Sequence, residues 1–232
     1  MSNTKSLYHG RRFPPEIIIH AVWLYHRFCL SYRDIEDLLA ERGIVVSYES
    51  IRQWCNHFGP EYARNLKKRR GRMGDTWFLD EVFVSISGKL HYLWRAVDQD
   101  GDTIDILVQK RRNRQAAKRF FRKLLKGQCA SPRSMVTDKL KSYSAAKREV
   151  MPSVPHCTDQ YANNRAELSH EPTRLRERQM RRFKSTGQAQ RFLTVHGVVG
   201  NLFRIGRHLM KASHYREFRS RAYSEWQQVT CA

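Results

Sequence analysis

The segment 76–86, TWFLDEVFVSI, has the aromatic and branched residues of a buried strand but carries Asp80 near its middle. Aspartate is a poor strand former, and a buried carboxylate is costly unless it is paired or binds a metal. A second short apolar segment, 134–136, leads into Asp138, and Glu167 follows in a polar stretch with helical character. Three carboxylates on three separated elements therefore indicate a site for divalent metal ions.

The segments around these acids follow a recognisable order. Strand-like stretches at 76–86, 89–97 and 103–109 are separated by Ser87-Gly88 and by DQDGD, which predicts an antiparallel meander. The later elements are a helix capped by Asn113, the strand 134–136, a helix at 140–149, an extended piece near His156, and helices at 164–182 and 187–210. This order is typical of a ribonuclease H-like domain. We therefore expect an α/β fold with a mixed five-stranded sheet and flanking helices.

The N-terminal third has the pattern of a helix-turn-helix unit. Pro14-Pro15 can open a first helix, Ser31 can cap a second and Ser47 can cap a third. The outward face of the third helix would carry Arg52, Gln53 and Asn56. These polar side chains can form hydrogen bonds with base edges in the major groove. A helical bundle used for oligomerisation is the alternative interpretation.

The charge balance favours a polyanionic partner. The net charge is +21 and the sequence pI is about 10.3, an excess that attracts phosphate backbones. A basic run follows the third helix and is predicted to be a linker that lies on DNA phosphates; it contains Lys67, Lys68, Arg69 and Arg70. A simple solvated run of charges is the alternative for this segment.

Other classes of protein fit the sequence poorly. No apolar run approaches the roughly 18 residues of a membrane span, and the first residues lack the apolar stretch of a secretory signal. We therefore expect no membrane partner and a cytoplasmic, nucleoid-associated protein. The five cysteines form no CxxC pair, so a zinc ribbon or disulfide framework is not indicated, and most are expected to be buried.

These patterns together predict four parts of the chain. They are a helix-turn-helix DNA-binding domain at 1–62, a basic linker at 63–75, a ribonuclease H-like catalytic domain at 76–212 and a tail at 213–232. The tail has no functional interpretation beyond being basic and partly aromatic.

The acidic residues predict a particular chemistry. Asp80, Asp138 and Glu167 could hold two Mg²⁺ ions about 4 Å apart, with Mn²⁺ as the alternative ion. One ion would activate a water or a 3′-hydroxyl, and the other would stabilise the leaving oxygen. Glu81 directly follows Asp80, and because adjacent strand residues face opposite ways we expect only one of them to join the site.

Basic residues accompany the predicted acids. Lys139 follows Asp138 and is a candidate DNA contact, although the pair could also be an exposed helix cap. Further along, Glu167 is followed at helical spacing by His170, Arg174 and Arg178, which places all four along one helix face. A carboxylate with arginines extending from it would form a cradle for a DNA strand. Glu167 as an ordinary surface acid and His170 as a packed or capping residue are the alternatives.

The chain also resembles a known family. TWFLDEVFVSISGKLHYLWRAVDQDGD, RRNRQAAKRFFRKLLKG, TDKLKSYSAAKREVMP and NNRAELSHEPTRLRERQMRRFKS are similar to transposases of bacterial insertion sequences. The nearest group is the IS-six family of DDE transposases, of the IS-twenty-six type. The resemblance implies that Asp80, Asp138 and Glu167 are the catalytic acids and that Arg174 contacts the transposon end.

The resemblance further implies an activity and its partners. Such a protein binds terminal inverted repeats in double-stranded DNA, hydrolyses the ends and joins the 3′-hydroxyls to target DNA, as a homodimer or larger assembly. Three alternatives stay open from the residues alone. They are a non-catalytic DNA-binding regulator, an inactive transposase copy and a metal nuclease of the same fold, such as a structure-specific resolvase.

Overall fold

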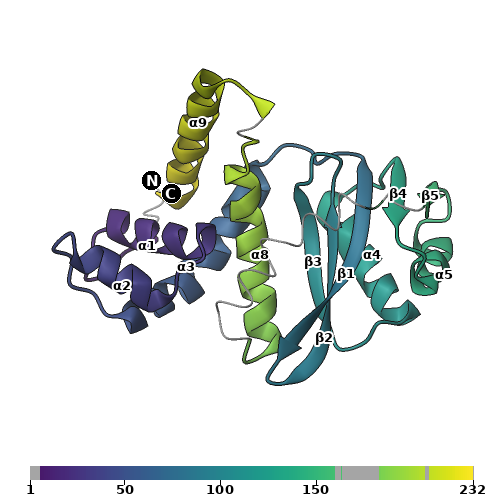
Figure 1. The fold of residues 1–232 in the computed structure, drawn as a ribbon, viewed down its shortest axis with the longest axis horizontal. Helices are drawn as coiled ribbons and strands as arrows, with labels where there is room; N and C mark the ends of the chain where they lie inside the picture. Colours follow the sequence, from purple (N-terminus) through teal and green to yellow (C-terminus); the bar gives the residue numbers. More distant parts are fainter. Residues whose placement is uncertain (1–5, 160–162, 164–182, 207–208, 232) are drawn as a thin grey trace, which may run out of the picture. The chain divides into compact units, whose positions relative to one another are not determined.

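The computed structural model describes residues 6–159, 163, 183–206 and 209–231, and the chain forms two compact units (Figure 1). Unit 1 comprises Met1–Arg70 with Val195–Ala232, and unit 2 comprises Gly71–Thr194. Helix α8 (Thr186–Phe203) contributes to both units. Four of the predicted site residues lie outside the described residues, namely Glu167, His170, Arg174 and Arg178.

Unit 1 begins with the three helices expected from the sequence. They are α1 (Pro15–Arg27), α2 (Tyr32–Ala40) and α3 (Tyr48–Arg69). A reciprocal capping box confirms the predicted start of α2, because the Ser31 hydroxyl accepts from the Asp34 N–H and the Asp34 carboxylate accepts from the Ser31 N–H. The Ser47 hydroxyl likewise accepts from the Ser50 N–H at the start of α3.

The structure changes the expected extent of three segments. Residues 63–69 were expected to lie in the linker, but they are the last turns of α3. The C-terminal segment, expected to be a tail, contains the helix α9 (Ala212–Thr230), which belongs to unit 1. Helix α8 ends at Phe203, short of the predicted 210.

Contacts within unit 1 explain why the C-terminal helix packs there. The Tyr8 hydroxyl donates to the Thr230 carbonyl, and the Tyr8 and Tyr62 hydroxyl oxygens are 2.6 Å apart. The Arg69 Nε donates to Glu225 of α9 over 2.7 Å. Polar and ionic contacts therefore connect Tyr8, the second half of α3 and the end of α9.

Unit 2 contains the predicted mixed five-stranded sheet, in the order β3-β2-β1-β4-β5 (Figure 1). Strands β1 (Thr76–Ile86), β2 (Lys89–Val97) and β3 (Thr103–Gln109) form the antiparallel meander. Strands β4 (Ser134–Thr137) and β5 (His156–Cys157) run parallel to β1. Strand order and direction together confirm the α/β, ribonuclease H-like architecture.

Two helices, α4 (Arg114–Gln128) and α5 (Lys141–Val150), pack on this sheet through one apolar cluster. Trp77 and Leu79 of β1, Trp94 of β2, and Phe120 and Tyr143 of the helices are all buried in the cluster. Trp77 and Leu79 lie two residues apart, so they share one face of β1. Continuing the same alternation places the residue at position 81 on the face that α4 and α5 cover.

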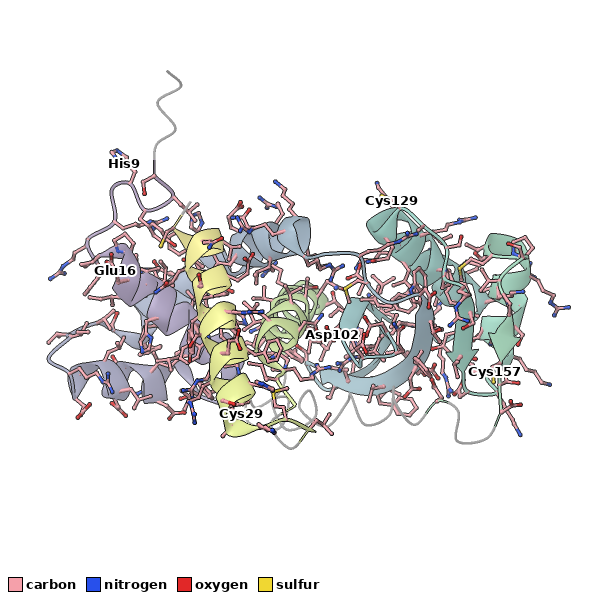
Figure 2. All side chains as sticks on the ribbon, turned by 90° about the horizontal axis from the view of Figure 1, so that it is seen from above. His9, Glu16, Cys29, Asp102, Cys129 and Cys157 are labelled. Atoms are coloured by element: carbon pink, nitrogen blue, oxygen red, sulfur yellow. The ribbon has the colours of Figure 1, made fainter. Side chains whose placement is uncertain are left out.

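The cysteines differ from expectation. In the described part of the chain none of the five forms a disulfide, and only Cys55 is buried, whereas Cys29 and Cys157 are half-buried and Cys129 and Cys231 are exposed. In unit 2, Cys129 and Cys157 lie at separate places (Figure 2). Cysteine is among the residue types most often buried in proteins, but this general tendency does not fix the position of each cysteine in one chain. Among the described residues, no helix is both long and apolar enough to cross a membrane.

Candidate metal centre

Parallel pairing brings Asp80 and Asp138 to the same level of the sheet. In the ladder between β1 and β4, Leu79 is the partner of Thr137, and the two aspartates are the next residues of their segments. Strand β4 ends at Thr137, so Asp138 lies just beyond its carboxyl end. Two predicted acids that are far apart in the sequence therefore meet next to each other.

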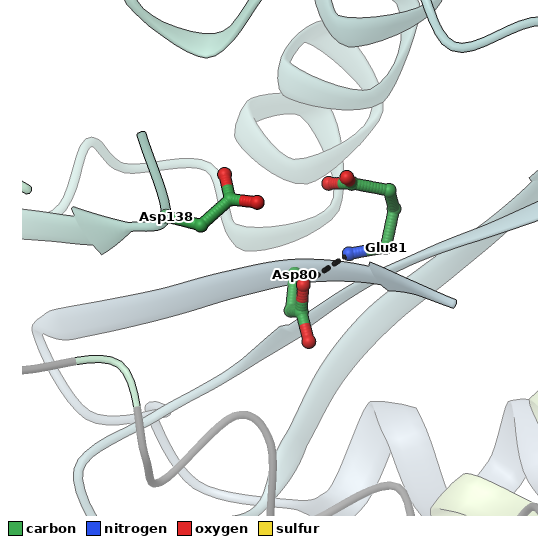
Figure 3. A group of neighbouring side chains, drawn as sticks. All are labelled: Asp80, Glu81 and Asp138. Atoms are coloured by element: carbon green, nitrogen blue, oxygen red, sulfur yellow. Dashed lines mark hydrogen bonds between the residues drawn. The ribbon is translucent and has the colours of Figure 1, made fainter. Parts of the chain in front are cut away.

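Glu81 joins them, contrary to the expectation that only one of the adjacent acids could take part. Figure 3 shows the Asp80 and Glu81 side chains leaving opposite sides of β1, as strand alternation requires. However, one Asp80 oxygen turns back along the strand and accepts from the Glu81 N–H over 2.8 Å. One carboxylate oxygen each from Asp80, Glu81 and Asp138 lies within 4.8 Å of the others.

This arrangement has the chemistry of a hard-cation site. Three carboxylates at this separation repel one another unless protons or cations offset their charge. Carboxylate oxygens are the ligands that Mg²⁺ and Mn²⁺ prefer, with water and phosphate oxygens completing the coordination. The described residues therefore fit a divalent cation.

The electrostatics of Glu81 are unusual for a glutamate. Its side chain is only 3% exposed, and burial raises the pKa of its carboxyl to about 7. The charges of Asp138 and Asp80 raise that pKa further, whereas Tyr143 and Arg112 lower it. The carboxyl therefore keeps its proton to a higher pH than an ordinary glutamate does.

Asp138 is subject to the same influences in weaker form. Burial raises its pKa and so does the charge of Asp80, while the Leu140 N–H and the Arg112 guanidinium lower it. The Leu140 N–H donates to Asp138 Oδ1 over 3.0 Å, which fixes the carboxylate at the start of α5. This hydrogen bond is compatible with the cap alternative, and the same carboxylate also belongs to the acidic cluster.

Two residues beside the cluster were not found from the sequence. Arg112 forms an ion pair with Glu81, and its Nη2 lies 3.6 Å from Asp138 Oδ2. Tyr143 is fully buried next to Glu81, and burial together with that carboxylate raises its pKa well above the ordinary value. Arg112 sits in a run of charged loop residues, and Tyr143 has the pattern of a core residue, so neither showed a local feature that pointed to the site.

The chain also returns to β1 close to the acids. Asn163, which is buried, donates from Nδ2 to the Leu79 carbonyl over 2.9 Å. Leu79 directly precedes Asp80, and Asn163 lies four residues before Glu167. An amide side chain therefore holds the chain at the strand that carries the first aspartate.

The predicted DNA contacts in unit 1 differ in exposure. The three candidates of α3 are exposed as expected, and Arg52 and Gln53 both donate to the Glu49 carboxylate. In the basic run, Lys68 and Arg69 are exposed, while Lys67 and Arg70 are half-buried. Lys139 of unit 2 is also exposed.

Comparison with known proteins gives consistent sequence relatives. The profile of a family described as a DDE domain matches residues 74–205. The transposase for insertion sequence-like element IS431mec of Staphylococcus aureus (strain N315) is 34% identical over 172 residues, covering 72% of this chain and 76% of that protein. The transposase for insertion sequence element IS257 in transposon Tn4003 of Staphylococcus aureus is 33% identical over the same length and coverage.

Solved structures give weaker matches. The catalytic core domain of HTLV-2 integrase, in complex with magnesium, aligns with a TM-score of 0.41 and 12% identity, covering 62% of this chain and 94% of that one. A chain of the simian T-cell lymphotropic virus intasome, in complex with the PP2A regulatory subunit B56 gamma, aligns with a TM-score of 0.40 and 14% identity. That alignment covers 60% of this chain and about half, 51%, of the other.

Proposed function

Because the chain belongs to the DDE transposases of bacterial insertion sequences, in the IS-six family, we propose that it cleaves transposon ends and joins them to target DNA. It binds the terminal inverted repeats, hydrolyses a phosphodiester at each end and transfers the freed 3′-hydroxyls. The observation that carries this proposal is the cluster of carboxylate oxygens within 4.8 Å at neighbouring strands.

Asp80 and Asp138 are the proposed first two metal ligands and catalytic acids, and Glu167 is the third. The proposed ions are Mg²⁺ or Mn²⁺, two per site. Bound there, they would lower the pKa of a water or 3′-hydroxyl and offset the charge that develops on the phosphate. The anchoring of Asn163 supports this role of Glu167. Asn163 is bonded to Leu79, next to Asp80, and the four residues from Asn163 to Glu167 span at most about 14 Å.

The two reaction steps need no covalent bond to the protein. In the first, a water oxygen bonds to phosphorus while the bond to the 3′-oxygen breaks, which frees a 3′-hydroxyl. In the second, that hydroxyl attacks a phosphodiester of the target, whose own 3′-oxygen leaves. Bonds to phosphorus are exchanged one for one, so no serine or tyrosine nucleophile is assigned.

DNA recognition is assigned to unit 1 together with basic residues of the catalytic part. Arg52, Gln53 and Asn56 on the exposed face of α3 are the proposed readers of the repeat sequence. The proposed phosphate contacts are Lys67, Lys68, Arg69, Arg70, Lys139, His170, Arg174 and Arg178. Joining two ends in one reaction favours a homodimer or larger assembly on the DNA.

The decisive experiment measures strand cleavage by the purified full chain. A duplex that carries the terminal repeat should be nicked at the repeat boundary in Mg²⁺, and the nicks should disappear with Asp80→Asn, Asp138→Asn or Glu167→Gln. Asp100→Asn is the matched control, because Asp100 is an exposed acid in the turn between β2 and β3. Equal nicking by the three site variants would refute the proposal, and repeat-specific binding without cleavage would favour a regulator.

A further inference from the structure

The Arg112 guanidinium lies at the rim of the carboxylate cluster and is anchored on its buried side. Its Nη2 pairs with Glu81 Oε1 and approaches Asp138 Oδ2 to 3.6 Å. The Glu81 side chain is 3% exposed, whereas that of Arg112 is 34% exposed. One edge of the guanidinium therefore faces a fixed carboxylate, while a third of the side chain faces solvent.

The backbone around Arg112 is held by the first turn of α4. Asn113 caps this helix, with its side chain accepting from the Ala116 N–H over 3.0 Å. On the other side, the Gln109 side chain donates to the Ala116 carbonyl over 2.8 Å. Arg112 thus projects from a short, tethered connection between β3 and α4, which limits how far its charge can move from the cluster.

The chemistry of the guanidinium points to an oxyanion partner. An arginine carries five N–H donors in a planar fork that suits phosphate oxygens. In the described part of the chain, both ion pairs of Arg112 use Nη2. Two of the three clustered acids already lie beside this one cation, so a phosphate drawn to metal ions there would meet Arg112 as a fixed positive group.

We propose that Arg112 binds the scissile phosphate of the DNA strand at the carboxylate cluster, and that Glu81 is the positioning residue that holds Arg112 in place. This inference rests on the proposed function, which supplies the DNA strand as substrate. A guanidinium that is held in place before the substrate binds loses little freedom on binding, so its contact with the phosphate contributes more fully to the transition state.

The test compares variants of the full chain in single-turnover cleavage of the terminal-repeat duplex in Mg²⁺. At saturating DNA, we expect Arg112→Gln to slow cleavage by about 100-fold and Glu81→Gln by about tenfold. Because Glu81 acts through Arg112, the double variant should be no slower than Arg112→Gln. Arg111→Gln is the matched control, since it removes the same charge from the neighbouring exposed residue and should cleave like the wild type.

Folding is followed by thermal unfolding of every variant. If Arg112→Gln does not fold, Arg112→Lys replaces it in the test. This variant should also slow cleavage, because lysine keeps the charge but lacks the planar fork. Two results would overturn the inference: an Arg112→Gln rate equal to that of Arg111→Gln, or a double variant that shows the product of both single effects. In the second case, a higher Mg²⁺ concentration needed for cleavage by Glu81→Gln and by the double variant would identify Glu81 as a metal ligand.

If the proposed function is wrong, the wild type itself will not cleave the terminal-repeat duplex, which distinguishes this outcome from the two results above. Binding to the same duplex then decides the role of Arg112. Losing one phosphate contact should reduce the slope of log affinity against log salt concentration by about 0.9. An unchanged slope for Arg112→Gln would refute the phosphate contact, and a further reduction in the double variant would refute the role assigned to Glu81.

Discussion

Asp80 in β1 and Asp138, just beyond the end of β4, stand level, because the residues before them are partners in the β1–β4 ladder. This relationship gives the cluster its geometry. Without the register, two acids separated by more than fifty positions in the chain would have no reason to lie within reach of a shared ion.

The first prediction concerns pH. Burial raises the pKa of Glu81 to about 7 from its ordinary 4.5, so the folded state binds the proton more tightly than the unfolded state. The resulting stabilisation is complete below about pH 4.5 and is lost as the pH rises through about 7. Asp138 acts in the same direction. Relative to Glu81→Gln, the metal-free wild type should lose roughly 1–3 kcal/mol of unfolding free energy across this range.

Denaturant titrations in EDTA at a series of pH values measure this difference. Parallel pH profiles for the two proteins would show that Glu81 ionises at its ordinary pKa in the folded chain.

A second prediction concerns metal binding without any DNA. Mg²⁺ or Mn²⁺ should raise the unfolding temperature of the wild type, because an ion that binds only the folded state stabilises it by about 2.7 kcal/mol at one hundred times its dissociation constant. Asp80→Asn and Asp138→Asn should remove this response, while Asp100→Asn should retain it. A rise of equal size in all four proteins would place the bound ions elsewhere.

The third prediction concerns sequence reading by α3. The Glu49 carboxylate accepts from Arg52 Nε over 2.8 Å and Nη2 over 2.6 Å, and hydrogen bonds from Arg52 and Gln53 lower the pKa of Glu49 to about 2. Because Arg52 is one of the proposed readers of the repeat sequence, Arg52→Ala should cost roughly 1–3 kcal/mol of discrimination between the terminal repeat and a scrambled duplex.

Lys68→Ala is the comparison for that measurement. As a proposed phosphate contact it should weaken binding to both duplexes equally. Competition binding at fixed salt separates the two effects, and equal weakening of both duplexes by Arg52→Ala would argue against base reading.

The last prediction concerns the attachment of α9. The Tyr8 hydroxyl lies between the buried Tyr62 hydroxyl and the Thr230 carbonyl, and burial raises the pKa of Tyr8 to about 12. Tyr8→Phe leaves both partners buried without it, so it should destabilise unit 1 by about 1–3 kcal/mol. Tyr223→Phe, at a partly exposed ring of α9, should change stability by less than about 0.5 kcal/mol. Chemical denaturation followed by helical circular dichroism compares them, and equal losses would contradict the prediction.

Local patterns predicted most elements of the fold. The Ser31 and Ser47 caps, the Ser87-Gly88 turn and the strand-like composition of 76–86 each reflect preferences of a few adjacent residues, and all appear as expected. Alternation along β1 also placed Asp80 and Glu81 on opposite sides. The end of α3 was missed, because the charged residues at 63–69 show no apolar periodicity strong enough to distinguish a helix from a linker.

The sequence by itself determined that strands and helices occur in this order, and that an aspartate interrupts one strand while another follows a second strand. Only the tertiary structure decided that these two acids stand level, that Glu81 joins them beside Arg112, and that burial raises the pKa of Glu81. It also decided that α9 packs with the N-terminal helices. Backbone preferences act between near neighbours, whereas strand pairing, burial and charge proximity arise between segments that meet only when the whole chain folds.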